Sequence, residues 1–182
     1  MKNGRRFDPD NDRLARDIRN TLARALMTTL ERMEIDPVID LATNYLDRPL
    51  ASAYHAYVRE RVDRYRLAVS LMAENNVADP FAQALILWNY GLFFEVHERL
   101  EGIWKKAAGR RRQALQALIR AAGTYVLLAN GRYPAAASMA AKAKTGLENY
   151  ADTLVELTDI RELSKSLQNL DLPPPKLFAR KT

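Results

Sequence analysis

Apolar residues recur at intervals of three and four along most of this 182-residue chain, and helix start and stop signals cut the pattern into segments. Asp36-Pro37 and Asp79-Pro80 each place a capping carboxylate before a proline of the first turn, and Asn130-Gly131 is typical of a helix end. No segment shows the alternation of a β-strand. The sequence therefore predicts an all-α fold, a compact antiparallel helical bundle of about seven helices.

The helical pattern suggests three regions. Residues 1–79 are predicted to be an N-terminal helical extension packed on the core, 80–170 the core helical domain, and 171–182 a Pro-rich extended tail with three consecutive prolines. The alanine-rich part of the core predicts tight helix packing. The predicted helical segments are 10–34, 36–46, 50–74, 80–89, 92–108, 110–129, 134–149 and 151–170.

Composition excludes several classes of protein. There is no cysteine, so disulfide frameworks and cysteine chemistry are excluded, and the two histidines leave little material for a nucleophilic triad. No apolar run approaches the length of a membrane span, and the basic N-terminus lacks the apolar segment of a signal peptide. We therefore expect a soluble, cytoplasmic protein without membrane partners.

The stretch from Asn89 to Trp104 holds most of the residues with chemical potential. Asn89 and Gly91 predict a turn, and the helix that follows carries His97 and Glu101 one turn apart on its apolar face. On the same projection Glu95 and Arg99 point to solvent. Because a buried carboxylate needs a partner, His97 is predicted to pair with Glu101. The predicted buried polar cluster, with partners from the next helix, consists of His97, Glu98, Glu101, Trp104, Gln116 and Arg120.

A metal site is the first alternative to a structural His–Glu pair. The sequence HERLE has the spacing of the zinc-protease helix motif, with glutamate in place of the second histidine. His97 and Glu101 would be ligands on one helix face, and Glu98 would be a further ligand or a general base. A metal-dependent hydrolase is possible on this interpretation. No cofactor is expected otherwise.

A second alternative is nucleic-acid binding. The net charge of +6 permits acidic partners. The dipole of the preceding helix explains Lys105 and Lys106 at its end. Three consecutive arginines at the start of the next helix are not explained in this way, because that end favours anions. The predicted phosphate contacts are Lys105, Lys106, Arg110, Arg111 and Arg112.

Residues from about 88 to 147 resemble the family catalogued as domain of unknown function 309. The resemblance rests on an Asn-x-Gly turn, a His-Glu-x-x-Glu-x-x-Trp core and a following helix rich in Leu, Gln, Ile and Ala. The matching residues are Asn89, Gly91, Phe94, Glu95, His97, Glu98, Glu101, Trp104, Leu115, Gln116, Ile119, Ala122, Asn130 and Gly131. The resemblance implies a compact helical bundle and no established activity.

The chain departs from the family pattern at Val96, Ala117 and Arg120, where Ala, Gly and Gln are usual. Arg120 adds a positive charge beside the carboxylates and favours a salt-bridged site over a metal site. The leading hypothesis is a non-enzymatic binding or scaffold module with an unidentified protein partner or as a homo-oligomer. The sequence identifies no substrate and does not decide whether the protein is an enzyme.

Overall fold

The computed structural model describes residues 6–154, 157 and 160–178, and the chain divides into two compact units, Met1–Asn76 and Val77–Thr182. The predicted all-α class is confirmed: the described residues contain eight α-helices, one short 3-10 helix and no β-strand beyond an isolated bridge residue at Leu157. Packing of the N-terminal region on the core stays a prediction.

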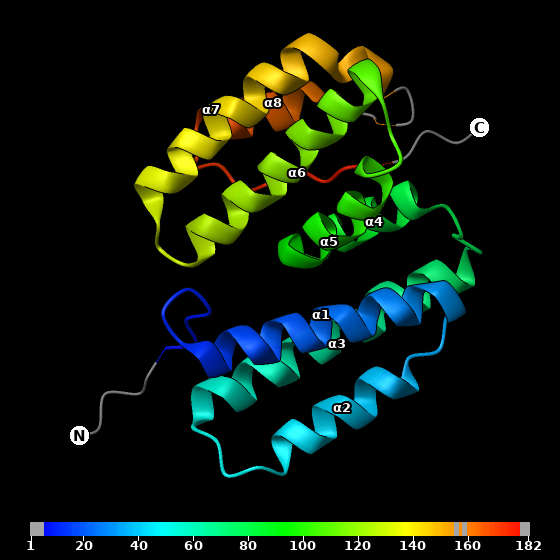
Figure 1. Ribbon diagram of the computed structural model, residues 1–182, viewed down its shortest axis with the longest axis vertical. Helices are drawn as coiled ribbons and strands as arrows, with labels where there is room; N and C mark the ends of the chain where they lie inside the picture. Colours follow the sequence, from blue (N-terminus) through cyan, green and yellow to red (C-terminus); the bar gives the residue numbers. More distant parts are fainter. Residues whose placement is uncertain (1–5, 155–156, 158–159, 179–182) are drawn as a thin grey trace. The chain divides into compact units, whose positions relative to one another are not determined.

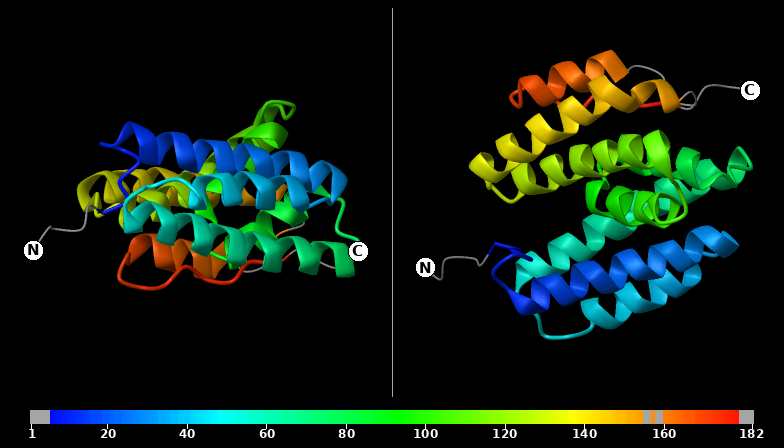
Figure 2. Two further views of the ribbon diagram at one scale, coloured as in Figure 1. Left: turned by 90° about the horizontal axis from the view of Figure 1, so that it is seen from below. Right: turned by 45° about the horizontal axis from the view of Figure 1, so that its top comes forward.

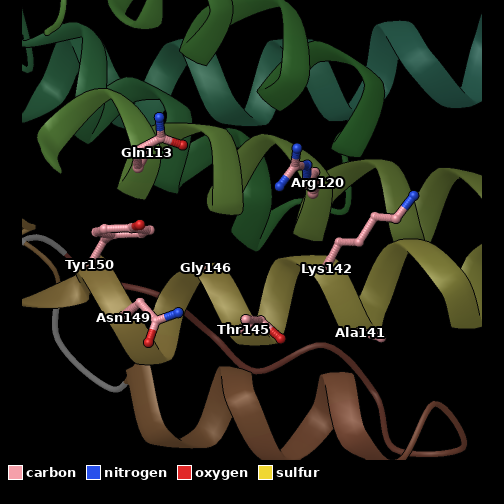
Figure 3. Close-up of a pocket in the computed structure, with 8 residues that line it drawn as sticks. All are labelled: Gln113, Arg120, Ala141, Lys142, Thr145, Gly146, Asn149 and Tyr150. Atoms are coloured by element: carbon pink, nitrogen blue, oxygen red, sulfur yellow. The ribbon is translucent and has the colours of Figure 1, made fainter. Parts of the chain in front are cut away.

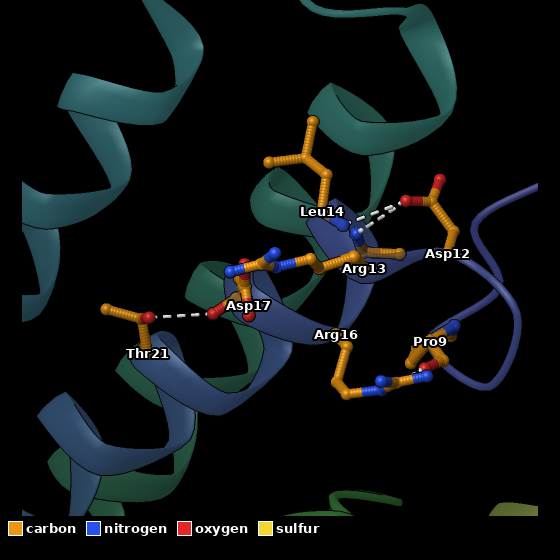
Figure 4. A network of polar contacts seen from close by, with 8 residues as sticks. Pro9, Asp12, Arg13, Leu14, Arg16, Asp17 and Thr21 are labelled. Atoms are coloured by element: carbon orange, nitrogen blue, oxygen red, sulfur yellow. Dashed lines mark hydrogen bonds and ion pairs between the residues drawn. The ribbon is translucent and has the colours of Figure 1, made fainter.

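The first unit is a three-helix bundle of α1 (Arg13–Arg32), α2 (Asp36–Leu46) and α3 (Ser52–Glu74), and each of its helices contacts the other two (Figure 1). The side chain of Asp12 caps α1, accepting hydrogen bonds from the backbone N–H groups of Leu14 at 2.9 Å and Ala15 at 3.3 Å (Figure 4). It also accepts one from the Tyr54 hydroxyl of α3. One carboxylate thus starts α1 and ties it to α3.

A compact loop precedes α1. Arg16 of α1 reaches back and donates to the carbonyl of Pro9 at 2.9 Å (Figure 4). Asp8 accepts a hydrogen bond from the Asn11 side chain at 2.8 Å. That bond, with further backbone bonds from Asn11 and Asp10, lowers the pKa of the Asp8 carboxyl below its usual range. These local bonds order the chain before the first helix.

The second unit contains α4 (Pro80–Asn89), α5 (Phe93–Trp104), α6 (Gly109–Ala129), α7 (Tyr133–Tyr150), η1 (Ala151–Thr153) and α8 (Ile160–Gln168). Within this unit α6 packs on α5 and on α7, and α8 packs on the other side of α7 (Figures 1 and 2). No helix in the described ranges is both long and apolar enough to cross a membrane.

The α6–α7 hairpin is packed through small residues. The buried face of α7 consists of Ala136, Ala140, Ala143 and Leu147. A Cβ atom added at Gly146 would lie 2.7 Å from the Cβ of Ala117 on α6, which is closer than two carbon atoms can approach. Gly146 and the alanines therefore let the two helices come close together, as the alanine-rich sequence predicts.

Two helix boundaries differ from the prediction. The helix predicted at 92–108 ends at Trp104, and Gly109 begins α6 instead of ending α5, with a φ of +57° that suits glycine. The single helix predicted at 151–170 is wrong. A 3-10 turn follows Tyr150 and α8 begins only at Ile160, while residues 155–156 and 158–159 lie outside the described residues.

Arginines at the start of α6 contact the chain where α7 ends and the 3-10 turn η1 follows. Arg110 donates to the carbonyl of Asn149 at 3.0 Å and pairs with Asp152 at 2.9 Å. Arg111 donates to the carbonyl of Thr153 at 3.1 Å. The last carbonyls of a helix have no intrahelical partner, so Arg110 stabilises the end of α7, and Arg111 holds the η1 turn that follows it.

Candidate ligand site beside His97

His97, Glu98 and Glu101 lie together on α5, but they are only partly buried. Their side chains are 39%, 38% and 35% exposed, so the predicted buried cluster is wrong in its burial. His97 Nδ1 lies 3.3 Å from Glu98 Oε1, whereas Glu101 pairs with Lys105 at 3.2 Å. The pairing of His97 with Glu101 predicted from their spacing is therefore replaced by contacts with other neighbours on the same helix.

These three side chains are nonetheless close enough to share one ion. One potential ligand atom from each of His97, Glu98 and Glu101 lies within 4.8 Å of the other two. One imidazole nitrogen and two carboxylate oxygens suit zinc, manganese or iron. Glu101 pairs with Lys105 through one carboxylate oxygen, and that exposed ion pair is weak. The donor set therefore fits a divalent cation.

A hollow of about 400 Å³ lies beside His97, between α5, α6 and α7. Its walls are mainly apolar, and its polar side chains come from α5 and α6. It is lined by Phe94, His97, Gln116, Ile119, Arg120, Gly123, Val126 and Met139. Three of the residues predicted for the polar cluster, His97, Gln116 and Arg120, are thus brought together, at the edge of a space large enough for a small molecule.

Gln116 and Arg120 do not act as partners of the glutamates. Within the described part of the chain, the side chains of Gln116 and Arg120 make no hydrogen bond or ion pair. The salt bridge expected between Arg120 and the carboxylates of α5 is therefore absent there. Both side chains keep their hydrogen-bonding capacity in the hollow.

The remaining predicted cluster residue, Trp104, lies apart from the hollow. The guanidinium of Arg112 lies over its ring at 4.1 Å from the centroid, which is a cation–π contact. Arg110 binds the end of α7, Arg111 binds the carbonyl of Thr153 in η1, and Lys105 pairs with Glu101. All three arginines of the predicted phosphate-binding segment thus have an intramolecular role.

The Asn89–Gly91 turn binds the C-terminal tail. Asn89 donates to the carbonyl of Leu177 at 2.7 Å and accepts from its backbone N–H at 2.8 Å. Trp88 Nε1 donates to the carbonyl of Pro175 at 2.8 Å, and Lys176 donates to the carbonyl of Asn89. Gly91 takes a φ of +69°, as its place in the turn requires. The predicted turn residues therefore hold the extended tail on α4.

A buried polar group on the opposite side of α5 was missed from the sequence. Glu95, predicted to face solvent, is 0% exposed, and Arg99 donates to the side chain of Gln83, which is itself buried on α4. Gln83 also donates to the carbonyl of Val77 at 2.9 Å. The available signal was Gln83 itself, a polar residue within an otherwise apolar helix.

The fold and the site define a class of protein: an all-helical domain with a ligand-sized hollow beside a histidine–carboxylate cluster. Residues 81–139 match the family model described as Domain of unknown function (DUF309), which confirms the resemblance found in the sequence. The match covers every residue that lines the hollow, from Phe94 to Met139. No curated protein and no solved structure matches the chain.

Proposed function

We propose that residues 77–182 form a non-enzymatic binding domain whose ligand occupies the hollow between α5, α6 and α7. The ligand class that fits is a small carboxylate with an apolar body. The observation that supports this proposal is the position of Arg120, a positive charge with no partner among the described residues, at the edge of an apolar space. The other lining residues would contact either the carboxylate or the apolar part of such a ligand.

The apolar part would pack against Phe94, Ile119, Val126 and Met139, where it is removed from water. The carboxylate would accept hydrogen bonds from Arg120, whose planar guanidinium matches two oxygens, and from the Gln116 amide. A volume of about 400 Å³ lies within the range of small-molecule pockets. The hollow thus offers one apolar and one cationic side to the same molecule.

The test compares octanoate with octanol by isothermal titration calorimetry on the full chain. The wild-type protein is expected to bind the acid about tenfold more tightly than the alcohol, a difference of about 1.4 kcal/mol. Arg120→Met keeps the apolar stem, and we expect it to abolish this preference. Arg110→Met is the matched control, since Arg110 lies on the same helix and pairs with Asp152. The proposal is refuted if the wild-type protein binds neither octanoate nor octanol.

A second candidate function is divalent metal binding by His97, Glu98 and Glu101, and the observation that favours it is the 4.8 Å grouping of their ligand atoms. The metal would lie on α5 next to the hollow. Metal content of the purified protein, and its melting temperature with added zinc, manganese or iron, test the site. His97→Ala should remove both the metal and the stabilisation, whereas His55→Ala, in the first unit, should change neither. Equal metal content in the wild type and the His97 variant refutes this candidate.

A further inference from the structure

A second, more polar pocket of about 410 Å³ lies between α6 and α7. Figure 3 shows Gln113 and Arg120 coming from α6 and the remaining side chains from α7. The pocket is lined by Gln113, Arg120, Ala141, Lys142, Thr145, Gly146, Asn149 and Tyr150. Arg120 lines both this pocket and the apolar hollow, and all other lining residues differ, so variants of those other residues test the two sites separately.

The charges of this pocket are unbalanced. Arg120 and Lys142 are its two cations, and the lining residues include no carboxylate. Within the described part of the chain, the side chains of Arg120 and Lys142 have no hydrogen bond or ion pair. Lys144, by contrast, pairs with Glu148 at 2.8 Å on the same helix. Two positive charges that are not paired with a carboxylate of the described residues thus line the same pocket.

Neutral hydrogen-bonding groups accompany the two cations. The amides of Gln113 and Asn149 and the hydroxyls of Thr145 and Tyr150 all line the same space. The polar side chains surround an open space, because Gly146 and Ala141 add little or no side-chain volume there. Two positive charges and several neutral donors along one pocket suit a ligand with more than one charge and several acceptor oxygens.

We infer that this pocket binds a phosphate group, either free or as part of a small phosphomonoester. A phosphate dianion matches two cations better than a carboxylate does, and its oxygens can accept from Arg120 and Lys142, while the neutral donors further along the pocket are available to the rest of a phosphomonoester. This inference does not depend on the carboxylate-binding function, because Lys142 and Thr145 do not line the hollow and His97 does not line this pocket.

The experiment measures binding of inorganic phosphate and of glycerol 3-phosphate to the full chain by calorimetry, at an ionic strength held constant with sodium chloride. Lys142→Ala is expected to weaken phosphate binding by about tenfold, and Lys142→Arg to restore it. Lys144→Ala is the matched control, because it removes one lysine from the same helix outside the pocket. Neither lysine belongs to the buried face of α7, so neither change should affect folding.

Binding of either probe with this pattern of variants supports the inference, and the preferred probe shows whether the ligand is the free ion or an ester. Absence of wild-type binding, or an equal loss in the Lys142 and Lys144 variants, overturns it, since an equal loss indicates a diffuse charge effect. Octanoate binding is expected to be unchanged in Lys142→Ala, and phosphate binding unchanged in His97→Ala. A negative result for phosphate binding therefore does not refute carboxylate binding, and a negative result for carboxylate binding does not refute phosphate binding.

Discussion

Gly146→Ala tests the close approach of α6 and α7. The added methyl carbon would lie 2.7 Å from the Cβ of Ala117, whereas carbon atoms in contact normally lie about 3.5–4.0 Å apart. Neither methyl group can rotate away, so the helices must move apart by about 1 Å at this point. Overpacking of this kind costs about 1–3 kcal/mol, against a gain in helix propensity of about 1 kcal/mol.

Gly102→Ala provides the matched comparison. Gly102 also lies within a helix, but a Cβ added there meets no atom within 4 Å. Because both variants gain helix propensity, the difference in their free energies of unfolding isolates the steric cost, which we expect to be about 1–3 kcal/mol. Urea unfolding followed by tryptophan fluorescence measures this difference for the second compact unit, since Trp88 and Trp104 both lie within residues 77–182.

A compensating change completes the test. Ala117→Gly removes the methyl group that the new side chain at position 146 would meet, so the double variant exchanges alanine and glycine between facing positions. Its stability should lie above the sum of the two single effects by at least about 1 kcal/mol. If Gly146→Ala is as stable as Gly102→Ala, or if the double variant shows no coupling, the reasoning from close packing is refuted.

Two further predictions concern the tail and pH. Leu177 is 1% exposed, whereas Phe178 is 56% exposed. Leu177→Ala should therefore lower the free energy of unfolding by about 2–3 kcal/mol, and Phe178→Ala by under about 0.5 kcal/mol. Urea unfolding measures both values, and equal losses would contradict burial of Leu177. Burial raises the pKa of the Tyr125 phenol to about 12, and a smaller effect of Ser166 opposes the rise. Because the unfolded phenol ionises near pH 10, stability should be unaffected below that pH and fall between pH 10 and 12. Tyr125→Phe should reduce that fall in pH-dependent urea unfolding, and an unchanged pH dependence would refute the assignment.

Helix limits could be predicted where a local signal sets them. The predicted limits 36–46 and 80–89 agree with α2 (Asp36–Leu46) and α4 (Pro80–Asn89), because a proline in the first turn acts locally. Asp79 caps α4 as predicted, whereas Asp36 lies inside α2 and makes no capping hydrogen bond within the described ranges, so the predicted cap at Asp36 is wrong. The 3-10 turn after α7, which replaces the start of the helix predicted at 151–170, could not be predicted in this way. Arg110 and Arg111 contact residues 149–153, about 40 positions further along the chain. The local periodicity of a sequence does not predict contacts between residues so far apart.

The members of the candidate site could be predicted better than their contacts. His97, Gln116 and Arg120 were selected from two helices, and the structure places all three at one hollow. Their contacts depend on side-chain directions that spacing alone does not determine. Glu101 has Lys105 at the favourable i+4 position, so it pairs towards the end of its helix and leaves His97 to Glu98.

The failure of the helical projection of α5 has a physical cause that bears on function. A projection assigns one buried face, but α5 contacts α4 as well as α6, and Arg99 binds Gln83 of α4. Glu95 lies one turn before Arg99, and Glu95 and Gln83 are both buried, so these two side chains belong to the folded core. His97, Glu98 and Glu101 stay partly exposed instead, and exposure is what a ligand site requires. The glutamate that the sequence placed in solvent is therefore structural, whereas the residues it placed in the core are accessible to a ligand.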